Sequence, residues 1–213
     1  MKKILLRQPV TIVANGNFPT HQNAINILKE SNCIIACDGA ANKLIENNYH
    51  IDYIIGDLDS ISRESIKLNK NKVILIKDQS ENDLRKAIKF LIHNNIKKFN
   101  ILGATGKRED HTLGNIFSIY DYKTNYNAII YTNYGLFKCL KDKSKIISHI
   151  GQQVSLFTPD NTIKISSKGL KYNFKSESLN SLFIGTLNES TSDIIEINLS
   201  HGKVLVFQEY KSK

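Results

Sequence analysis

Short apolar runs alternate with amphipathic stretches along residues 10–131 of the chain. Most of these runs are apolar at nearly every position, which is typical of strands buried on both faces of a parallel sheet. The expected strands are residues 10–14, 33–36, 53–55, 73–76, 99–102 and 128–131. The intervening stretches carry apolar residues at helical spacing. The pattern predicts an α/β domain with a mostly parallel sheet flanked by helices on both faces.

The expected helices have recognisable start signals. The first is predicted to begin at Pro19 or Thr20, and the one after residue 78 has a Ser80-x-x-Asp83 pattern that fits a capping box. The last helix of this region is expected to carry four residues on one apolar face: Leu113, Ile116, Phe117 and Tyr120.

Helical spacing disappears beyond residues 135–150, where short alternating segments are separated by turn residues. The segments expected to be strands are 146–147, 154–157, 163–165, 182–184, 194–197 and 204–207. We therefore expect a small antiparallel β-sandwich or barrel. The predicted organisation is an α/β nucleotide- and metal-binding domain at residues 1–140, followed by an all-β domain at residues 141–213.

The composition is that of an ordinary globular protein, with 41% hydrophobic and 23% charged residues in a chain of 213. No apolar run approaches the roughly 20 residues of a membrane-spanning helix. The run at residues 4–6 is too short for the core of a signal peptide. The three cysteines lack zinc-ligand spacing and are expected to be buried thiols. We expect a cytoplasmic protein with no membrane partner.

The formal net charge of +9 raises the question of nucleic acid. Lysine is spread along the whole chain, however, and no basic run is interleaved with aromatic residues, as a nucleic-acid footprint would require. A solvated lysine-rich surface is therefore the preferred interpretation, and no nucleic-acid partner is expected. There are only four arginines, which makes their positions informative because arginine forms bidentate contacts with phosphate.

Five strand ends in the first domain carry polar or glycine-rich sequences. They are Asn15-Gly16, Asp38-Gly39, Asp57-Leu58-Asp59, residues 78–83 and residues 103–110. Parallel strands place their carboxyl ends along one edge of a sheet, where ligands of open α/β proteins bind. A single acidic turn is commonplace, but five such ends on one edge predict a shared site.

The carboxylates in this set are suited to a metal ion. Asp57, Asp59 and Asp83 are hard oxygen ligands of the kind that Mg²⁺ prefers, and Mg²⁺ leaves positions for water and phosphate oxygens. Asp83 has a competing interpretation as part of the capping box with Ser80, and both roles are compatible.

The segment Gly103-Ala104-Thr105-Gly106-Lys107-Arg108 ends a strand and opens a helix, so it could hold phosphate. It lacks the spacing of a Walker A loop. Arg108 is the expected phosphate ligand, and Asp110 either orients it or caps the helix. His111 is expected to be a hydrogen-bonding residue rather than a base. Spacing and composition thus predict a Mg²⁺-dependent enzyme that handles phosphate.

At these residues the chain resembles the thiamine pyrophosphokinase family. The segments that carry the resemblance are Asp38-Gly39-Ala40, residues 56–60, Asp78-Gln79 with Asp83, residues 103–111, and Gly169-Leu170-Lys171-Tyr172. The resemblance implies transfer of a diphosphoryl group from ATP to the hydroxyl of thiamine. It also implies a homodimer in which the all-β domain contributes to thiamine binding and dimerisation.

The resemblance implies roles for particular residues. The catalytic set is Asp57, Asp59, Asp83 and Arg108, of which the three aspartates bind Mg²⁺ and the triphosphate. Further substrate-binding residues are Asn15, Asp38, Gly39, Gln79, Gly103, Thr105, Gly106, Asp110, His111, Tyr172 and Asn188. Tyr172 could face the cationic thiazolium ring of thiamine. The residue that accepts the hydroxyl proton is left open between Asp59 and Asp83.

The chain departs from the family pattern at several positions. Ser80 stands where the family commonly has Asp, Asn82 where it has Thr, and Lys107 where it often has Gly. Leu187-Asn188 stands where it usually has Ser-Asn. Two alternatives are left open: a related pyrophosphokinase for another alcohol, because of Leu187, and a nucleotide or RNA binder without turnover, with the +9 charge as its footprint.

Overall fold

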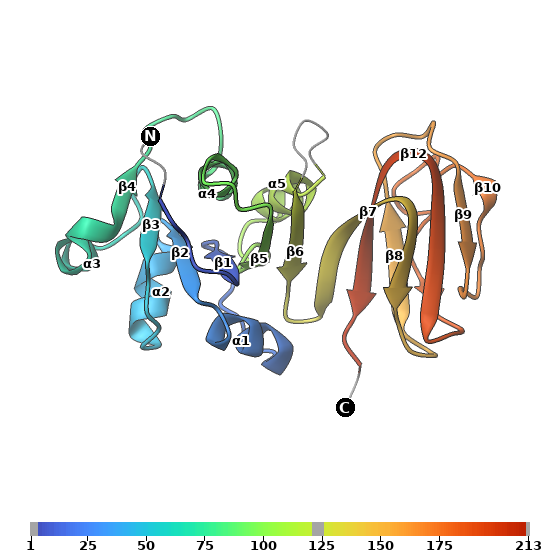
Figure 1. Cartoon of the computed structure of the whole chain (residues 1–213), viewed down its shortest axis with the longest axis horizontal. Coiled ribbons are helices and arrows are strands. Elements are labelled where there is room, and N and C mark those ends of the chain that lie inside the picture. The colour runs from blue at the N-terminus through green and yellow to red at the C-terminus, as the bar shows by residue number, and fades with distance from the viewer. Residues whose placement is uncertain (1–3, 121–125, 212–213) are drawn as a thin grey trace. The chain divides into compact units, whose positions relative to one another are not determined.

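The computed structural model describes residues 4–120 and 126–211 of the chain and forms two compact units (Figure 1). Among the described residues, the first unit comprises 4–118 and 126–133, and the second comprises 119–120 and 134–211. Each unit has its own buried apolar cluster.

The first unit is built on a parallel sheet with the strand order β6-β5-β1-β2-β3-β4. The strands are β1 Val10–Val13, β2 Cys33–Cys37, β3 Tyr53–Gly56, β4 Val73–Leu75, β5 Lys98–Leu102 and β6 Asn127–Tyr131. Ile12 on the central β1 pairs with Ile35 and Ile101, and all three side chains are fully buried. The near-continuous apolar runs are therefore explained by burial on both faces.

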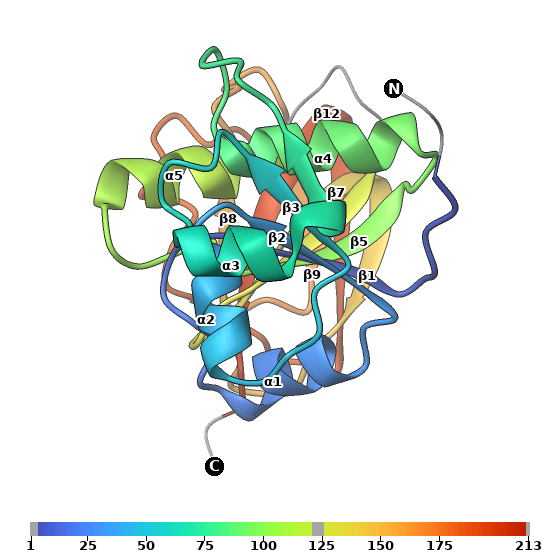
Figure 2. The same ribbon diagram turned by 90° about the vertical axis from the view of Figure 1, so that its left-hand side faces the viewer.

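Helices lie on both faces of this sheet, with α1 and α2 on one side and α4 and α5 on the other (Figure 2). They are α1 Gln22–Lys29, α2 Ala40–Glu46, α3 Arg63–Leu68, α4 Asp83–His93 and α5 Glu109–Ser118, with a 3₁₀ turn η1 at Lys70–Lys72. Leu28, Leu44 and Leu91 are among the side chains that these helices bury. The predicted α/β architecture with a parallel sheet is confirmed.

Two predicted helix starts are wrong. Helix α1 begins at Gln22, with His21 as its N-cap, rather than at Pro19 or Thr20. Helix α4 is capped by Asn82, whose side chain accepts a hydrogen bond from the Arg85 amide at 3.0 Å. Ser80 and Asp83 therefore do not form a capping box, because Asp83 is the first helical residue. Asn and Ser are almost equally good caps, so the sequence alone does not choose between them.

The last predicted helix also ends earlier than expected. Helix α5 stops at Ser118, so Tyr120 lies beyond it and belongs to the second unit. There the Tyr120 hydroxyl donates a hydrogen bond to the Lys203 carbonyl at 2.7 Å. Leu113 is 60% exposed rather than part of a buried face.

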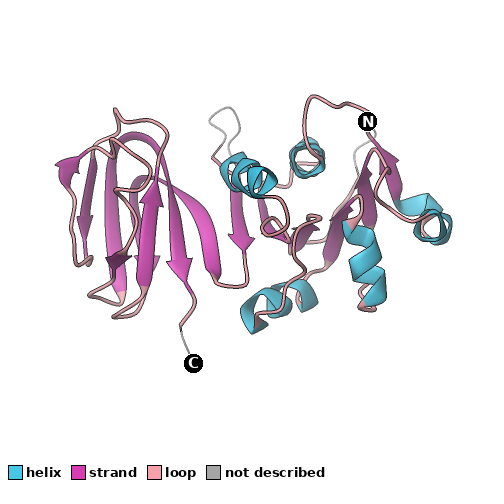
Figure 3. Cartoon of the chain, turned by 180° about the vertical axis from the view of Figure 1, so that it is seen from behind, coloured by secondary structure: helices cyan, strands magenta, loops and turns pink. Residues whose placement is uncertain are grey.

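The second unit consists of antiparallel strands, as predicted (Figure 3). They are β7 Gly135–Ile147, β8 Gln153–Phe157, β9 Ile165–Lys168, β10 Lys175–Glu177, β11 Asn188–Glu189 and β12 Ile194–Glu209. The long β12 pairs with β7 along its length, with β9 over its first part and with β8 over its last part.

Four predicted strands of this unit need correction. Residues 194–197 and 204–207 belong to one strand, β12, because a register shift between Asn198 and Lys203 accommodates His201-Gly202 inside it. Residues 182–184 form a turn whose apolar side chains are exposed, and β9 begins only at Ile165. In each case strand pairing, which sequence periodicity does not report, decides the element.

Within the residues that the structure describes, we find no helix with the length and apolar character needed to cross a membrane.

Gly56 ends β3 at a position where a side chain does not fit. A Cβ atom there would lie 2.9 Å from the Asp38 Cβ and 3.2 Å from the Asp83 Cγ. We predict that Gly56→Ala lowers stability by roughly 1–3 kcal/mol through overpacking, a fall of several degrees in melting temperature. Thermal unfolding followed by circular dichroism measures this change.

Gly114→Ala is the matched control, since its Cβ would meet nothing within 4 Å in helix α5. Alanine is preferred over glycine inside a helix by about 0.5–1 kcal/mol, so this variant should be slightly more stable than the parent. A Gly56→Ala variant as stable as Gly114→Ala would contradict the close packing at the end of β3.

Candidate functional site

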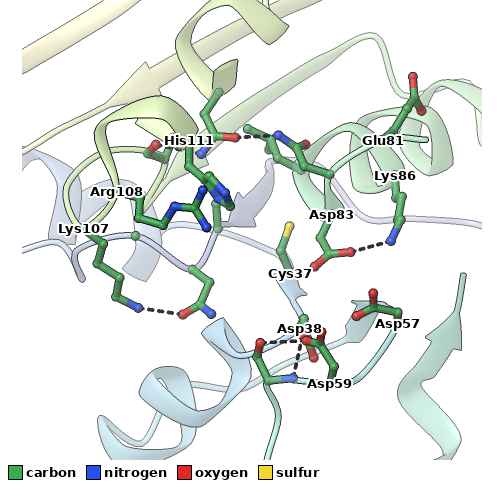
Figure 4. Close-up of a pocket in the computed structure, with 18 of the residues that line it drawn as sticks. Cys37, Asp38, Asp57, Asp59, Glu81, Asp83, Lys86, Lys107, Arg108 and His111 are labelled. Atoms are coloured by element: carbon green, nitrogen blue, oxygen red, sulfur yellow. Dashed lines mark hydrogen bonds and ion pairs between the residues drawn. The ribbon is translucent and has the colours of Figure 1, made fainter. Parts of the chain in front are cut away.

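A cavity of about 720 Å³ lies in the first unit at the carboxyl ends of its strands (Figure 4). Its lining comes from the segments that follow β1, β2, β3 and β5, from the segment that precedes α4, and from α4 and α5 themselves. Nine of the predicted site residues line it: Asn15, Asp38, Asp57, Asp59, Gln79, Asp83, Gly106, Arg108 and His111. The structure therefore brings together groups that are distant in sequence.

The glycine-rich segment after β5 supports one wall of this cavity. The Gly16 amide donates to the Gly103 carbonyl at 2.7 Å, and the Asn17 amide donates to the Thr105 carbonyl at 2.8 Å. A Cβ on Gly16 would lie 2.4 Å from both carbonyl oxygens, so only glycine allows these two segments to pack. Gly103 and Thr105 are absent from the cavity lining and hold the loop in place instead.

Three carboxylates form a cluster that could hold a cation. One oxygen each of Asp38, Asp57 and Asp59 lies within 4.8 Å of the others. Asp38 and Leu58 adopt left-handed backbone conformations, with φ angles of 40° and 69°. Such conformations are uncommon for residues other than glycine, and they direct the two chain segments around this cluster.

Asp38 is the buried member of the cluster, with 2% of its surface exposed. Its Oδ2 accepts a hydrogen bond from the Ser60 amide at 3.0 Å, whereas its Oδ1 is buried without a hydrogen-bond partner. Burial, which is the largest cause, and the nearby Asp59 and Asp83 together raise the pKa of Asp38 to about 6 against the lowering effect of the Ser60 amide. A buried carboxylate oxygen without a donor is well suited to a bound cation.

Asp57 and Asp59 are more exposed, and each accepts a hydrogen bond from a neighbouring side chain. The Gln79 side-chain amide donates to Asp57 Oδ2 at 2.6 Å, and this bond lowers the pKa of Asp57. The Ser60 hydroxyl donates to Asp59 Oδ1 at 2.8 Å. Gln79 thus contacts the acidic cluster directly, in the cavity where the sequence placed it.

Asp83 lies on the first turn of α4, close to the cluster but paired elsewhere. Its Oδ1 forms an ion pair of 2.9 Å with the ammonium of Lys86, whose side chain is only 4% exposed. The sequence-based prediction grouped Asp83 with Asp57 and Asp59 as metal ligands, whereas the tightest group in the described residues contains Asp38 in that place. The metal-binding role of Asp83 stays a prediction.

Basic side chains lie on the opposite side of the cavity. Figure 4 shows Lys107, Arg108 and His111 across from Asp57 and Asp83. Arg108 pairs with Asp110 through bonds of 2.6 and 3.1 Å, and this pair lowers the pKa of Asp110. Asp110 therefore contacts Arg108 in the way required to orient it, although Asp110 itself does not line the cavity. The Lys107 ammonium donates to Asn15 Oδ1 at 2.9 Å.

Two predicted residues belong to the second unit, where they contact each other. The Tyr172 amide donates to Asn188 Oδ1 at 3.1 Å, and Asn188 Nδ2 donates to the Tyr172 carbonyl at 2.8 Å. Asn188 is buried and Tyr172 is 65% exposed, so the amide side chain supports the backbone that carries the ring. Leu187, where the family pattern differs, is 82% exposed with a φ angle of 59°.

Several lining residues are absent from the predicted set. They are Cys37, Ser60, Glu81, Asn82, Lys86, Lys107 and Asn115, together with apolar and backbone contributors. Lys86 is the most informative of these, because lysine is rarely buried without a charged partner. Its sequence signal was the three-residue spacing from Asp83, which places both side chains on one helix face.

The site fits a hard divalent cation. The cluster offers three carboxylate oxygens at mutual distances suited to one ion, and the Asp38 oxygen without a donor points to the same chemistry. No soft ligand pair accompanies them, since Cys37 is the only cysteine of the described lining.

Comparison with known proteins gives matches over most of the chain. The family description "Thiamin pyrophosphokinase, catalytic domain" matches residues 24–131, and "Thiamin pyrophosphokinase, substrate-binding domain" matches residues 135–207. A search of the curated proteins found no match.

Solved structures with the same fold include thiamine pyrophosphokinase from Bacillus subtilis, at 19% identity and a TM-score of 0.80 over 95% of this chain and 99% of that one. The enzyme from Candida albicans matches at 20% identity and a TM-score of 0.78, over 94% of this chain and 89% of that one. The yeast enzyme matches at 17% identity and a TM-score of 0.75, over 94% of this chain and 86% of that one. These likenesses support the fold, and the two domain matches identify the family. The chain belongs to the thiamin pyrophosphokinase family and carries both its catalytic and its substrate-binding domain.

Proposed function

We propose that the cavity of the first unit binds ATP with Mg²⁺ and transfers the diphosphoryl group to the hydroxyl of thiamine. The products would be thiamine diphosphate and AMP. The observation that carries this proposal is the arrangement of an acidic cluster and a basic wall across one cavity in a member of this family. The acidic side suits a metal ion and the basic side suits phosphate oxygens.

The carboxylates would hold the metal. Asp57 and Asp59 belong both to the predicted ligand set and to the observed cluster, and Asp38 completes the cluster. A bound Mg²⁺ supplies charge neutralisation on the phosphate oxygens during the transfer. Gln79 keeps Asp57 in place and favours its ionised form through their hydrogen bond.

The basic wall would bind the phosphates. Arg108 is 71% exposed and held by Asp110, so its guanidinium is oriented and still accessible. Lys107 adopts a left-handed backbone conformation next to Gly106 and reaches Asn15 across the loop. Arginine and lysine at these positions would stabilise charge on the phosphoryl oxygens as the bond to AMP breaks.

The transfer forms a bond between the thiamine oxygen and the β-phosphorus and breaks the bond from that phosphorus to the oxygen of AMP. The hydroxyl proton has to leave during this exchange. Asp59 and Asp83 are the two candidates to accept it, since both are partly exposed carboxylates in the cavity lining.

Thiamine recognition would involve the second unit. Tyr172 presents an exposed ring that suits a cationic thiazolium, and Asn188 fixes the backbone behind it. The match to a substrate-binding domain over residues 135–207 supports this assignment. A homodimer and a cytoplasmic location stay predictions.

The first test is product formation. With ATP, Mg²⁺ and thiamine, the wild-type protein should produce AMP and thiamine diphosphate in equal amounts, as measured by liquid chromatography.

Asp57→Asn should lower kcat/KM by about 100-fold or more, because a neutral amide replaces a carboxylate of the metal cluster. Asp142→Asn, an exposed substitution in β7, is the control and should keep wild-type activity. A wild type without turnover would contradict the function, and a fully active Asp57→Asn variant would contradict the metal assignment.

The second test removes the metal. Chelation with EDTA should abolish product formation and added Mg²⁺ should restore it, because charge on the triphosphate is then again neutralised. Mg²⁺ with ATP should also raise the melting temperature of the wild type, and it should raise that of Asp57→Asn less. Full turnover in excess EDTA would show that the carboxylate cluster has another purpose.

A further inference from the structure

Lys86 is a buried cation at the edge of an acidic site. Its side chain is 4% exposed, and its ammonium lies 2.9 Å from Asp83 Oδ1. Both residues are on the first turns of α4, three positions apart, so the helix itself fixes the pair. Figure 4 shows Lys86 beside Asp83 and across from the basic wall that carries Lys107 and Arg108.

The other charges of the cavity make this position unusual. Five acidic residues line it: Asp38, Asp57, Asp59, Glu81 and Asp83. Glu81 is already paired with Arg85 and Lys89, whereas Lys107 and Arg108 are exposed and bonded to Asn15 and Asp110. Among the lining residues that the structure describes, Lys86 is thus the only buried cation.

Burial of a lysine is costly unless the charge is compensated. Burial alone would lower the pKa of Lys86, but Asp83, Asp57 and Asp78 together raise it above its ordinary value. The ammonium therefore interacts with Asp57 and Asp78 as well as with its close partner Asp83.

We propose that Lys86 is a positioning residue that makes the acidic site select a metal ion bound to phosphate over a free metal ion. The fixed positive charge of Lys86 pairs with one carboxylate oxygen of Asp83 and repels a bare divalent cation that approaches the site. The same charge attracts an anionic metal–nucleotide complex. This inference rests on the proposed function for the identity of the nucleotide.

The charge of Lys86 has opposite effects on the two ligands, whereas a purely structural role of Lys86 would affect both in the same direction. Removing the positive charge should strengthen binding of a free cation and weaken binding of an anionic complex, since both interactions are coulombic. A general loosening of α4 or of Asp83 would weaken both.

The test is a pair of binding measurements on Lys86→Met, whose side chain fills similar space without a charge. Free Mn²⁺ binding, followed by electron paramagnetic resonance, should become at least about fivefold tighter. Binding of the Mg²⁺ complex of a non-hydrolysable ATP analogue, followed by calorimetry, should become at least about fivefold weaker. Lys86→Arg keeps the charge and should stay within about twofold of wild type in both.

Lys89→Met is the matched control. Lys89 lies on the same helix and pairs with Glu81, but its side chain is 60% exposed, so the same change in net charge should leave both affinities unchanged. If Lys86→Met melts below the assay temperature, Lys86→Gln replaces it, because glutamine is neutral and can still donate a hydrogen bond to Asp83.

If Lys86→Met bound both Mn²⁺ and the nucleotide complex more weakly than the wild type, or bound both with unchanged affinity, the proposal would be overturned. Neither binding measurement, with Mn²⁺ or with the non-hydrolysable analogue, depends on turnover by the protein. A wild-type protein that fails to make thiamine diphosphate would count against the proposed function and leave the Mn²⁺ comparison valid.

Discussion

Repulsion among carboxylates at the carboxyl edge of the parallel sheet is the constraint on which the rest of the site depends. Two like charges about 4 Å apart cost between about 1 and 4 kcal/mol, according to how much water surrounds them. The chain gathers three such groups, at Asp38, Asp57 and Asp59, and adds Asp83 nearby. Each carboxylate is compensated by a hydrogen-bond donor or a cation: Ser60 serves Asp38 and Asp59, Gln79 serves Asp57, and Lys86 serves Asp83.

The compensation is local and specific. Asp38 receives the Ser60 amide, Asp57 receives the Gln79 side chain, and Asp83 is paired with Lys86. Among these carboxylates, only Oδ1 of Asp38 is buried without a hydrogen-bond donor, so the need for a compensating positive charge is greatest at this atom. A site in which every carboxylate was fully satisfied would have little affinity for a cation, so this distribution favours binding there.

Buried strands make this arrangement possible. Ile54 and Ile55 of β3 and Ile34 to Ala36 of β2 are almost completely buried, so the positions at which these strands end are fixed by packing. The backbone then turns through left-handed conformations at Asp38 and Leu58. Such conformations are costly, and a well-packed core is what holds them in place.

Much of this organisation is readable from the sequence, because parallel strands with apolar faces have a strong periodic signal. The convergence of five strand ends followed from that signal alone. The choice of Asp38 as the third member of the cluster did not, since it depends on left-handed turns at Asp38 and Leu58 that no residue type requires. The register shift that includes Gly202 within β12 could not be read from the sequence, because it depends on strand pairing. The choice of Asn82 over Ser80 as cap could not be read either, because Asn and Ser are almost equally good caps.

The charge of the whole chain and the charge of the site have opposite signs, and this difference has a physical consequence. The protein carries a formal net charge of +9, yet five acidic residues line the cavity. Surface charges act over a Debye length of about 8 Å at physiological salt, so distant lysines contribute little inside the cavity. They can still favour the approach of anionic ligands at low ionic strength. Binding itself is then decided by the few charges within the cavity. These are the carboxylates that require a cation, Lys107 and Arg108 opposite them, and Lys86 beside Asp83. An anionic ligand that brings its own cation satisfies all three at once.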